Sequence, residues 1–488
     1  MTTSPTPAPT PPTSPPAPSR STIVRVVAAS MAGTTVEWYD FFLYGVAAAL
    51  VFPKVFFPAS DPAVGVLLAL GTFAIGFIAQ PIGGLVFGHY GDLLGRKKLL
   101  VISLVMMGLS TFLIGVLPAY ETIGLAAPIL LIVLRLVQGF GLGGEWGGAV
   151  LIVSEYGDKE RRGYWASWPQ AGVPLGQLIA NGLLALLAFV QPEEAFLAWG
   201  WRIPFLMSAV LVLIGLFIRL SIEESPVFRQ AAEQAAAQAA EQAAEQAGGA
   251  GGADATSHMP IVEVFRKYPR EVFTAMGARF AENVSYYIFT VVIVTYLTKN
   301  PPEHTASSSF VLNAVLIGAA VHFVTIPMWG ALSDRFGRKP LYLFGAVGVA
   351  VWSFVFVFLI DTKSFPLTVV AVVGGLLFHG AMYGPQAAFL SELFGTRVRY
   401  SGVSVGYQLA SIVAGGLAPI IAVALYTGFG SGYAVAVYVT LASVITVLAV
   451  GTYSETKNRD LADDPAFARG GATAPGTPAR SSAPEVRR

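Results

Sequence analysis

The sequence predicts an all-α membrane protein with twelve transmembrane helices, arranged as two parallel repeats of six helices each. Three observations lead to this fold class. The 488 residues include only 30 basic and 29 acidic ones, or 12%, about half of the roughly 25% typical of soluble domains. Hydrophobic residues make up 54% of the chain, and the mean hydropathy is +0.63. Long apolar runs recur along the chain, and a charged loop motif occurs twice.

The apolar runs are long enough to cross a bilayer, which takes about 20 residues in a helix. The predicted spans cover approximately residues 24–52, 62–88, 99–118, 128–153, 163–190, 201–220, 271–298, 308–332, 341–360, 366–391, 401–428 and 431–453. Five regions follow: a disordered Pro-rich tail (1–22), a six-helix bundle (23–221), a cytoplasmic linker with an Ala/Gln/Glu-rich helix (222–270), a second six-helix bundle (271–454) and a disordered C-terminal tail (455–488).

The basic residues predict the orientation of the chain, because cytoplasmic loops carry an excess of Lys and Arg. With the N-terminus inside, 24 of the 30 basic residues lie in cytoplasmic segments. The outer loops hold four, namely Lys54, Arg202, Lys299 and Lys363. The sequence therefore predicts a multi-pass protein of the cell membrane with both termini in the cytoplasm.

Two loops carry the same charged motif. GHYGDLLGRKKLL follows the second span, and GALSDRFGRKPLY follows the eighth. Five identities lie at a constant offset of 242: Gly88, Asp92, Gly95, Arg96 and Lys97 match Gly330, Asp334, Gly337, Arg338 and Lys339. After the fourth and tenth spans, a second set matches at an offset of 237: Glu155 and Arg162 with Glu392 and Arg399. Parallel six-helix repeats of this kind are one known architecture of secondary transporters.

The motifs resemble those of a known transporter family. The duplicated G-x3-D-x2-G-R-K loop is similar to the signature of the major facilitator superfamily. GTTVEWYDFFLYG in the first span, RLVQGFGLGGEWGGA in the fourth and AWGWRIPF before the sixth resemble the metabolite:H+ symporter family. That family includes shikimate, α-ketoglutarate, citrate and proline/betaine carriers. The resemblance extends over about residues 22–460, and it implies the major facilitator fold and proton-coupled transport.

The duplicated loops are candidates for a gate. Their glycines permit a tight turn, and an aspartate there can cap a helix start or pair with a nearby arginine. We expect ion pairs of both motifs to stabilise the outward-facing state and to break as the two halves move. The resemblance implies that Glu155, Arg162, Glu392 and Arg399 join these charge clusters. The alternative is that the basic residues only set the topology.

Charged residues inside the spans are candidates for function, because a charge at the centre of a span costs roughly 2.5–3.5 kcal/mol. The first and seventh spans carry polar triads at the 242 offset. Because the charged members of each triad are spaced i,i+3, they share one helix face. We expect both triads to face one central cavity. The matching residues are Glu37, Asp40 and Tyr44 in the first span, and Arg279, Glu282 and Tyr286 in the seventh.

Acidic residues in the spans are the candidates for proton coupling, because desolvation and a like-charged neighbour favour proton binding by a carboxylate. They are Glu37, Asp40, Glu145 and Glu282, with Glu37 and Asp40 preferred. Candidates for substrate binding are Arg135, Arg279, Tyr44, Gln138, Tyr286, Gln80 and His322. The two arginines either hold a substrate anion or pair with the acids. The alternative is structural ion pairing, for example between Arg135 and Glu37. A further histidine, His379, can titrate near neutrality, although a lone intramembrane histidine is more often a packing residue.

These observations predict a secondary transporter that carries a small organic acid together with protons by alternating access. The alternatives are uptake of a zwitterionic osmolyte such as proline or betaine, and a channel. An enzyme is not expected, because the zinc-protease, phosphate-loop and Ser/His/Asp motifs do not appear. The chain has no Cys and a net charge of +1, so neither a cofactor, nor a metal, nor a nucleic-acid partner is expected. The protein is expected to work as a monomer in the bilayer.

Overall fold

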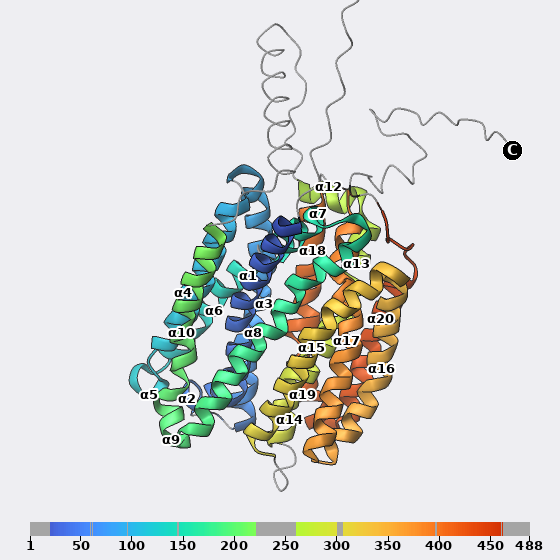
Figure 1. Ribbon diagram of the computed structural model, residues 1–488. Coiled ribbons are helices and arrows are strands. Elements are labelled where there is room, and N and C mark those ends of the chain that lie inside the picture. Colours follow the sequence, from blue (N-terminus) through green and yellow to red (C-terminus); the bar gives the residue numbers. More distant parts are fainter. Residues whose placement is uncertain are drawn as a thin grey trace, which may run out of the picture.

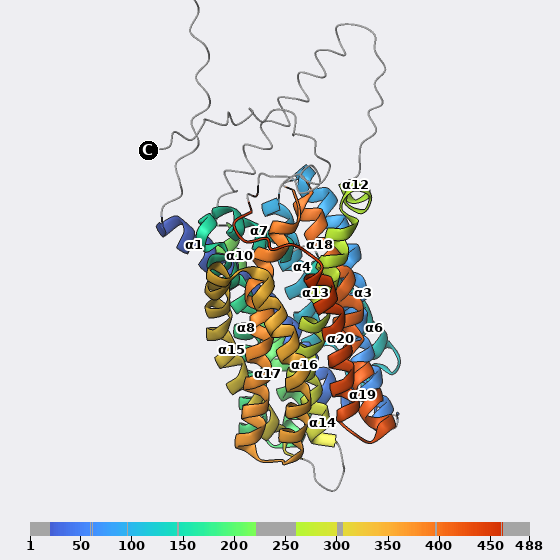
Figure 2. The same ribbon diagram turned by 90° about the vertical axis from the view of Figure 1, so that its right-hand side faces the viewer.

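The described part of the chain forms a single bundle of long helices that run side by side (Figure 1). The computed structural model describes residues 20–58, 60, 62–94, 96–143, 146–220, 260–299, 306–395, 398–459 and 461. No strand occurs among these residues. Helix α1 begins, and helix α20 ends, at the same end of the bundle, which we call the termini end (Figure 2).

The first half of the bundle runs from Arg20 to Leu220. Its helices are α1 (Arg20–Leu50), α2 (Phe52–Val55), α3 (Pro62–Leu94), α4 (Arg96–Val116), α5 (Tyr120–Ile123), α6 (Ala126–Gly143), α7 (Trp146–Tyr156), η1 (Lys159–Arg161), α8 (Arg162–Val190), α9 (Glu193–Ala195), η2 (Phe196–Gly200) and α10 (Arg202–Leu220).

The second half of the bundle follows after α12 (Pro260–Lys267), a short helix inside the predicted linker. Its helices are α13 (Pro269–Tyr287), η3 (Ile288–Val292), α14 (Ile293–Lys299), α15 (Ser308–Phe336), α16 (Arg338–Asp361), α17 (Phe365–Leu393), α18 (Arg399–Ser411), η5 (Ile412–Gly416), α19 (Ala418–Phe429) and α20 (Tyr433–Gly451). The rest of the predicted linker helix lies outside the described residues.

The described helices account for the twelve predicted spans. Nine of them are long and apolar enough to cross a membrane, or ten if the bent pair Glu193–Gly200 and Arg202–Ile218 is one span. Helix α4 contributes a shorter apolar stretch, Val101–Val116. Helix α1 is buried along most of its length and carries two carboxylates. The twelve-helix architecture predicted from the sequence is therefore confirmed.

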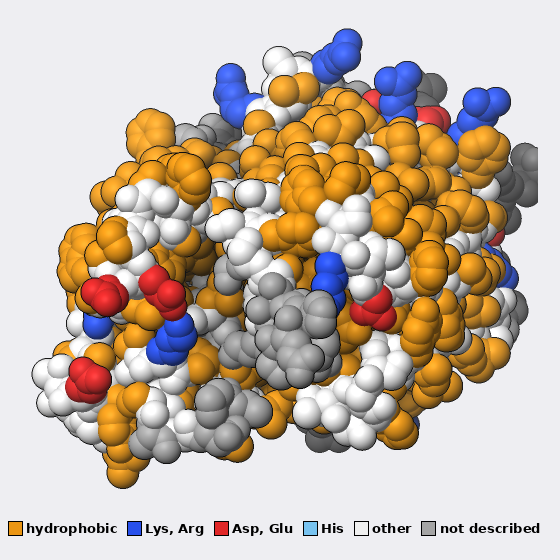
Figure 3. All heavy atoms as spheres, turned by 90° about the horizontal axis from the view of Figure 1, so that it is seen from below, with side chains coloured by type: hydrophobic (Ala, Val, Ile, Leu, Met, Phe, Trp, Pro, Cys, Tyr) orange, Lys and Arg blue, Asp and Glu red, His pale blue; other side chains and the backbone are white. Residues whose placement is uncertain are grey.

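The outer surface of the bundle is apolar, as a lipid-facing surface must be. Phe189 and Phe217, on α8 and α10, are 81% and 76% exposed. From the end opposite the termini, hydrophobic side chains dominate the visible surface, and only a few charged ones interrupt it (Figure 3). A soluble protein could not leave so much apolar surface in water.

The two halves pack against each other mainly through α8 and α15, and also through α3 and α18. Glycines bring the backbones of α8 and α15 together. A Cβ placed on Gly163 would lie 2.5 Å from Ser333 Oγ and 2.6 Å from the carbonyl oxygen of Gly330. A Cβ on Gly330 would lie 2.6 Å from the carbonyl oxygen of Gly163. The halves therefore touch through backbone atoms at the termini end.

An ion-pair network joins the halves beside this contact. The Glu392 carboxylate on α17 pairs with Arg162 of the first half at 3.0 Å and with Arg338 of the second half at 3.4 Å. Arg338 also pairs with Asp334 at 2.7 Å. All of these side chains are buried or nearly so, with Glu392 only 1% exposed. We call Arg162, Asp334, Arg338 and Glu392 the inter-half network.

Asp334 caps a helix of the opposite half. Its carboxylate oxygens accept hydrogen bonds from the backbone N–H groups of Gly163 and Tyr164, each at 2.8 Å. These N–H groups lie in the first turn of α8, where the helix dipole favours a negative charge. The capping role predicted for the loop aspartate thus appears between halves rather than within one loop.

The segment after α20 packs onto the same network. Glu455 accepts hydrogen bonds from the backbone N–H groups of Arg338 and Lys339 at the start of α16, at 2.9 and 3.1 Å. The hydroxyl of Thr456 donates to Glu392 at 2.8 Å. These contacts lie within residues 455–488, the predicted disordered tail, whose first residues are therefore ordered.

Replacing Glu392 with Gln should lower the free energy of unfolding by roughly 3–5 kcal/mol, because two buried guanidinium groups lose their shared counter-ion. The measurement is thermal or denaturant unfolding in detergent. The matched control is Glu193→Gln, which removes an exposed ion pair with Lys54 at 2.7 Å. That pair lowers the pKa of Glu193 through the hydrogen bond from Lys54, yet exposed pairs contribute at most about 1 kcal/mol. Equal effects of the two substitutions would contradict the structural role of the network.

Replacing Gly330 with Leu should hold the two halves apart at the termini end, because no side chain fits between α8 and α15 there. The chain contains no Cys, so spin labels can be placed at Glu160 and Arg335 by single Cys substitutions. Electron–electron distance measurements should then show a longer distance in the variant. The control is Gly428→Leu, because a Cβ at Gly428 meets nothing within 4 Å. An unchanged distance in Gly330→Leu would refute this account of the contact.

Candidate functional site

Two clusters of polar side chains lie buried in the middle of the bundle. The first, which we call the arginine cluster, consists of Asp40, Tyr44, Thr111, Arg135 and Gln138 in the first half. The second, which we call the histidine cluster, consists of Arg279, Glu282, His322, His379 and Gln386 in the second half. All ten residues carry a polar or charged group, and none is more than 3% exposed. Buried groups of this kind need partners, so their contacts indicate what each cluster can do.

Arg135 on α6 is held by an amide and by aromatic rings. Its Nη1 donates to Gln138 Oε1, and Gln138 Nε2 donates to Thr111 Oγ1 at 2.8 Å. The guanidinium carbon lies 4.3 Å from the centre of the Tyr44 ring, and the rings of Phe41 and Phe73 lie at 4.8 and 5.0 Å. These cation–π contacts stabilise the charge without neutralising it.

Two nitrogens of Arg135, Nε and Nη2, have no hydrogen-bond partner among the described residues. The ion pairs given for the described ranges do not join Arg135 to a carboxylate. Gly76 on α3 makes room for the guanidinium, because a Cβ there would lie 2.5 Å from Nε. Arg135 therefore keeps donors available for an anionic ligand.

Asp40 on α1 lies close to this arginine. The polar groups that act electrostatically on its carboxyl are those of Thr111, Glu37 and Arg135. Asp40 is 1% exposed, and its Oδ1 has no partner among the described residues. An acid, an arginine and a set of hydroxyl and amide groups thus share one buried site.

Two tyrosines at matching positions of the repeat each donate a hydrogen bond beside one of the clusters. Tyr44 donates to Thr72 at 2.6 Å within the first half. Its counterpart Tyr286 donates to Gln177 Oε1 of α8 at 2.8 Å, across the interface between the halves. The seventh-span tyrosine thus reaches the interface between the halves, whereas the bond of its first-span counterpart stays within one half.

Hydrogen bonds connect the histidine cluster in series. Arg279 donates to Glu282 Oε2 and forms an ion pair with it. His379 Nε2 lies 3.2 Å from Glu282 Oε1, and His379 Nδ1 lies 3.0 Å from His322 Nε2. Gln386 Nε2 donates to Glu282 Oε2 at 3.3 Å and to the Tyr342 hydroxyl at 2.8 Å. Of the two predicted substrate arginines, Arg279 is thus neutralised by its own helix, whereas Arg135 is not.

The histidine cluster reaches the first half through stacked rings. The Arg279 guanidinium lies 3.6 Å from the centre of the Tyr407 ring. Tyr407 stacks on Trp146 of α7 with their centroids 3.7 Å apart, and Trp146 Nε1 donates to Gln170 Oε1 of α8 at 2.9 Å. Movement between the halves must therefore alter the surroundings of Arg279.

The structure brings together most of the predicted site residues. Glu37 is also buried on α1, at 3% exposure. Gln80 is buried on α3, where the α3 backbone contacts Gly143 of α6. Of the residues predicted for a gate, Arg162, Asp334, Arg338 and Glu392 form the inter-half network, Gly330 lies at the α8–α15 contact, and Gly337 adopts φ 102° before α16. Lys339 Nζ donates to the carbonyl oxygens of Gly451 and Tyr453, and Arg399 Nε to those of Ser391 and Phe394.

The side chains of seven predicted residues lie outside the described part of the structure. They are Gly88, Asp92, Gly95, Arg96, Lys97, Glu145 and Glu155. Conversely, the sequence-based selection omitted Thr111, Gln177 and Gln386, which bond directly to cluster residues. Each is a hydrogen-bonding side chain inside an apolar span, and that signal alone could have marked them.

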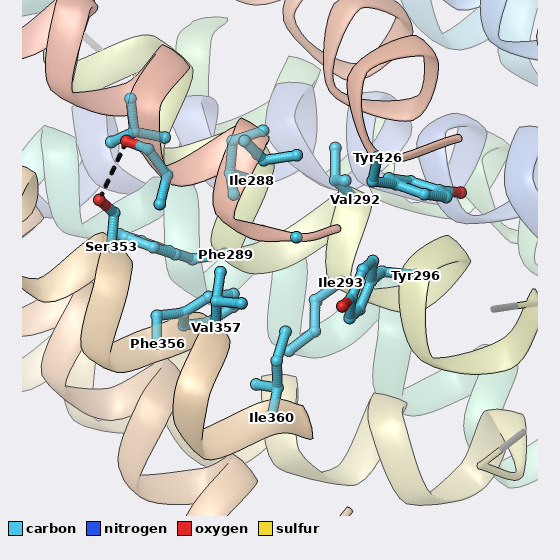
Figure 4. Close-up of a pocket in the computed structure, with 14 residues that line it drawn as sticks. Ile288, Phe289, Val292, Ile293, Tyr296, Ser353, Phe356, Val357, Ile360 and Tyr426 are labelled. Carbon is cyan, nitrogen blue, oxygen red and sulfur yellow. Dashed lines mark hydrogen bonds between the residues drawn. The ribbon is translucent and has the colours of Figure 1, made fainter. Parts of the chain in front are cut away.

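A separate pocket in the second half is apolar (Figure 4). It lies between η3, α14, α16, α19 and α20, and its polar side chains are those of Tyr296, Ser353 and Tyr426. Ser353 already donates to the carbonyl oxygen of Ala436 at 3.3 Å. Because its lining holds no charged residue, this pocket suits an anion poorly, and the buried clusters remain the candidate site.

Known proteins with similar sequences are transporters. The family model described as "Sugar (and other) transporter" matches residues 25–465. The shikimate transporter of Escherichia coli is 39% identical, over 87% of this chain and 93% of that protein. The inner membrane metabolite transport protein YhjE of Escherichia coli is also 39% identical, over 90% and 95%. The proline/betaine transporter of Escherichia coli is 35% identical, over 90% and 84%.

Solved structures of similar fold are major facilitator superfamily proteins. The proton:xylose symporter XylE bound to 6-bromo-6-deoxy-D-glucose superposes with a TM-score of 0.69 at 19% identity, covering 91% of this chain and 98% of that one. A partially occluded inward-open form of XylE from E. coli gives a TM-score of 0.65 at 19% identity, covering 90% and 100%. The chain therefore belongs to the sugar (and other) transporter family of the major facilitator superfamily, and it is a multi-pass membrane transporter rather than an enzyme.

Proposed function

We propose that this transporter carries a small organic acid, of the shikimate or di- and tricarboxylate type, together with protons by alternating access. The observation that carries the proposal is Arg135, a buried guanidinium whose Nε and Nη2 have no partner among the described residues. Burying such a charge without a counter-ion is costly. A substrate carboxylate can supply the counter-ion and can accept both free N–H groups at once.

Asp40 provides the link to protons. An ionised Asp40 next to Arg135 repels an incoming carboxylate, whereas a protonated Asp40 does not. The substrate anion and the proton therefore favour each other's binding, which is the requirement for symport. Glu37, three residues earlier on α1, acts on the same carboxyl and is the second candidate for this proton.

Alternation requires the inter-half network to open. In the present state it closes the termini end through Arg162, Asp334, Arg338 and Glu392. The excess of Lys and Arg in the loops at this end supports a cytoplasmic location for it and for both termini. The closed network then corresponds to a state in which the substrate does not reach the cytoplasm. We further infer that one chain suffices, because both clusters lie within it.

Uptake of a zwitterion such as proline or betaine is the second candidate. It is supported by the 35% identity to the proline/betaine transporter and by the two carboxyl groups of Glu37 and Asp40, which act on each other. A zwitterion would need an acid that stays ionised beside its cationic group. The organic acid is favoured because the free donors of Arg135 call for an anion and Asp40 is placed to hold a proton.

The substrate class can be tested with the purified protein in proteoliposomes under an imposed pH gradient. The panel should hold labelled shikimate, α-ketoglutarate, citrate, benzoate, proline and betaine. We expect saturable uptake of at least one organic acid that stops when a protonophore removes the gradient. Uptake of proline or betaine alone would reject the organic acid in favour of the second candidate.

Arg135→Gln should raise the half-saturation concentration for the acid roughly 10- to 100-fold, because a charge-assisted contact with the substrate is lost. Arg135→Lys should recover part of the loss, since it restores the charge but not the paired N–H groups. The control is Lys54→Gln, whose side chain lies in the exposed pair with Glu193. A normal half-saturation concentration in Arg135→Gln would exclude this residue from substrate binding.

Asp40→Asn should retain exchange of labelled for unlabelled substrate and lose accumulation driven by the pH gradient, because the amide cannot release a proton. Both quantities can be measured in the same proteoliposome preparation. Accumulation that persists in Asp40→Asn would assign the coupling proton to another residue.

A further inference from the structure

Three titratable side chains of the second half form a continuous line of hydrogen bonds. His322 comes from α15, His379 from α17 and Glu282 from α13. Their exposures are 0%, 1% and 3%. His379 lies in the middle, with His322 Nε2 at 3.0 Å from its Nδ1 and Glu282 Oε1 at 3.2 Å from its Nε2.

We propose that His322, His379 and Glu282 form a proton relay, in which one added proton reverses both hydrogen bonds, neutralises Glu282 and releases Arg279 from its counter-ion. The inference rests on the proposed function for its role in transport. It goes beyond that proposal because it places a second proton site in the half that does not contain Asp40.

The polarity of the line follows from its chemistry. An ionised Glu282 can only accept, so His379 must carry its proton on Nε2 and donate it to Glu282. A neutral His379 then has an unprotonated Nδ1, which must accept from the Nε2–H of His322. His322 Nδ1 is left unprotonated, and it has no hydrogen-bond partner among the described residues. The line thus ends in a buried base.

A proton that binds His322 Nδ1 can travel along the line without any side chain turning. The Nε2 proton of His322 passes to His379 Nδ1, and the Nε2 proton of His379 passes to Glu282 Oε1. The final state holds one more proton than the first. Both histidines are then neutral again with their protons on Nδ1, and the Glu282 hydroxyl donates to His379 Nε2. Every hydrogen bond is kept with its direction reversed.

The other ionisable groups around the relay do not offer the proton another path. The ionisable groups around it are Arg279, Tyr286 and Tyr287 from α13, Tyr342 from α16, Tyr383 from α17 and Tyr407 from α18. From the opposite half, α8 contributes Gln177, which binds Tyr286 and does not ionise. The tyrosines remain protonated near neutral pH, and the arginine cannot give up its proton.

A metal site does not explain the arrangement. The three side chains follow one another in a line, and among the described residues no group of His, Asp and Glu is placed to hold a metal ion.

Neutralising Glu282 changes the role of Arg279. In the present state Arg279 is paired with Glu282 Oε2 and stacked near Tyr407, which itself stacks on Trp146 of the first half. Once Glu282 is protonated, Arg279 becomes a buried cation that gains from an anion at the interface between the halves. Proton uptake by the relay and binding of a substrate carboxylate would therefore favour each other here, as they do at Arg135.

The relay can be tested without any substrate by nitrogen-15 histidine NMR of the protein in lipid. The chain has five histidines, and replacing His89, His258 and His304 with Gln leaves only the two of the relay. At neutral pH both should be neutral and protonated on Nε2. At lower pH both should change together to Nδ1-protonated neutral rings. A doubly protonated histidine, or two independent titrations, would overturn the relay.

Glu282→Gln provides the sharpest variant, because it mimics the protonated acid. Arg279 and Gln386 both donate to the Oε2 side of Glu282, so the amide oxygen must stay there and the amide NH2 must face His379. Both histidines should therefore be protonated on Nδ1 at every pH. If both rings keep the Nε2 proton in this variant, the proposed polarity is wrong.

A transport assay separates the relay from the proposed function. With shikimate as the probe, the background protein is the one in which His89, His258 and His304 are replaced by Gln. Relative to it, His379→Phe should keep exchange and reduce pH-driven accumulation at least 10-fold. Undiminished accumulation in His379→Phe would overturn the coupling role. Absence of shikimate transport in the background protein, together with the tautomer reversal in Glu282→Gln, would count against the proposed substrate and still support the relay.

Discussion

The structure depends on one constraint: inside a bundle surrounded by lipid, every charge must find its partner within the protein. Glu392 satisfies Arg162 and Arg338 together, and Glu282 satisfies Arg279. Arg135 donates a hydrogen bond to an amide and lies against aromatic rings, and its Nε and Nη2 have no hydrogen-bond partner among the described residues. The arginines therefore differ in whether a carboxylate pairs with them. Those that are paired hold the bundle together, and the one that is not is available to a ligand.

The constraint also explains why the two halves differ in spite of their matching motifs. The matched triads place an acid at 37 and an arginine at 279, and acids at 40 and 282. In the second half the arginine and the acid lie on one helix and neutralise each other. In the first half the arginine comes from α6, so the acids of α1 are not tied to it in the same way. The two halves thus have similar folds but present differently charged side chains to the middle of the bundle.

The sequence predicted the fold well, because a run of about 20 apolar residues has few alternatives to a spanning helix. It also marked Asp40, Arg135 and Glu282 as candidates, since intramembrane charges are rare. It could not predict that His322 and His379 touch, because they lie 57 residues apart on different helices and their contact depends on how α15 and α17 are rotated. Gln386 and Thr111 could have been marked as hydrogen-bonding side chains inside apolar spans, but the residues to which they bond depend on how the helices pack.

The position of Asp334 at the first turn of α8 has a consequence for how easily the protein changes state. Its bonds to Gly163 and Tyr164 lie in the first turn of a helix, at the termini end of the bundle. When the halves separate, water can replace each bond as it is lost, so each exchange costs only about 1 kcal/mol. A substitution, by contrast, leaves a charge buried with nothing to replace its partner. Because water replaces these hydrogen bonds when the halves separate, the closed and open states stay close in free energy. Thermal motion can then interconvert them.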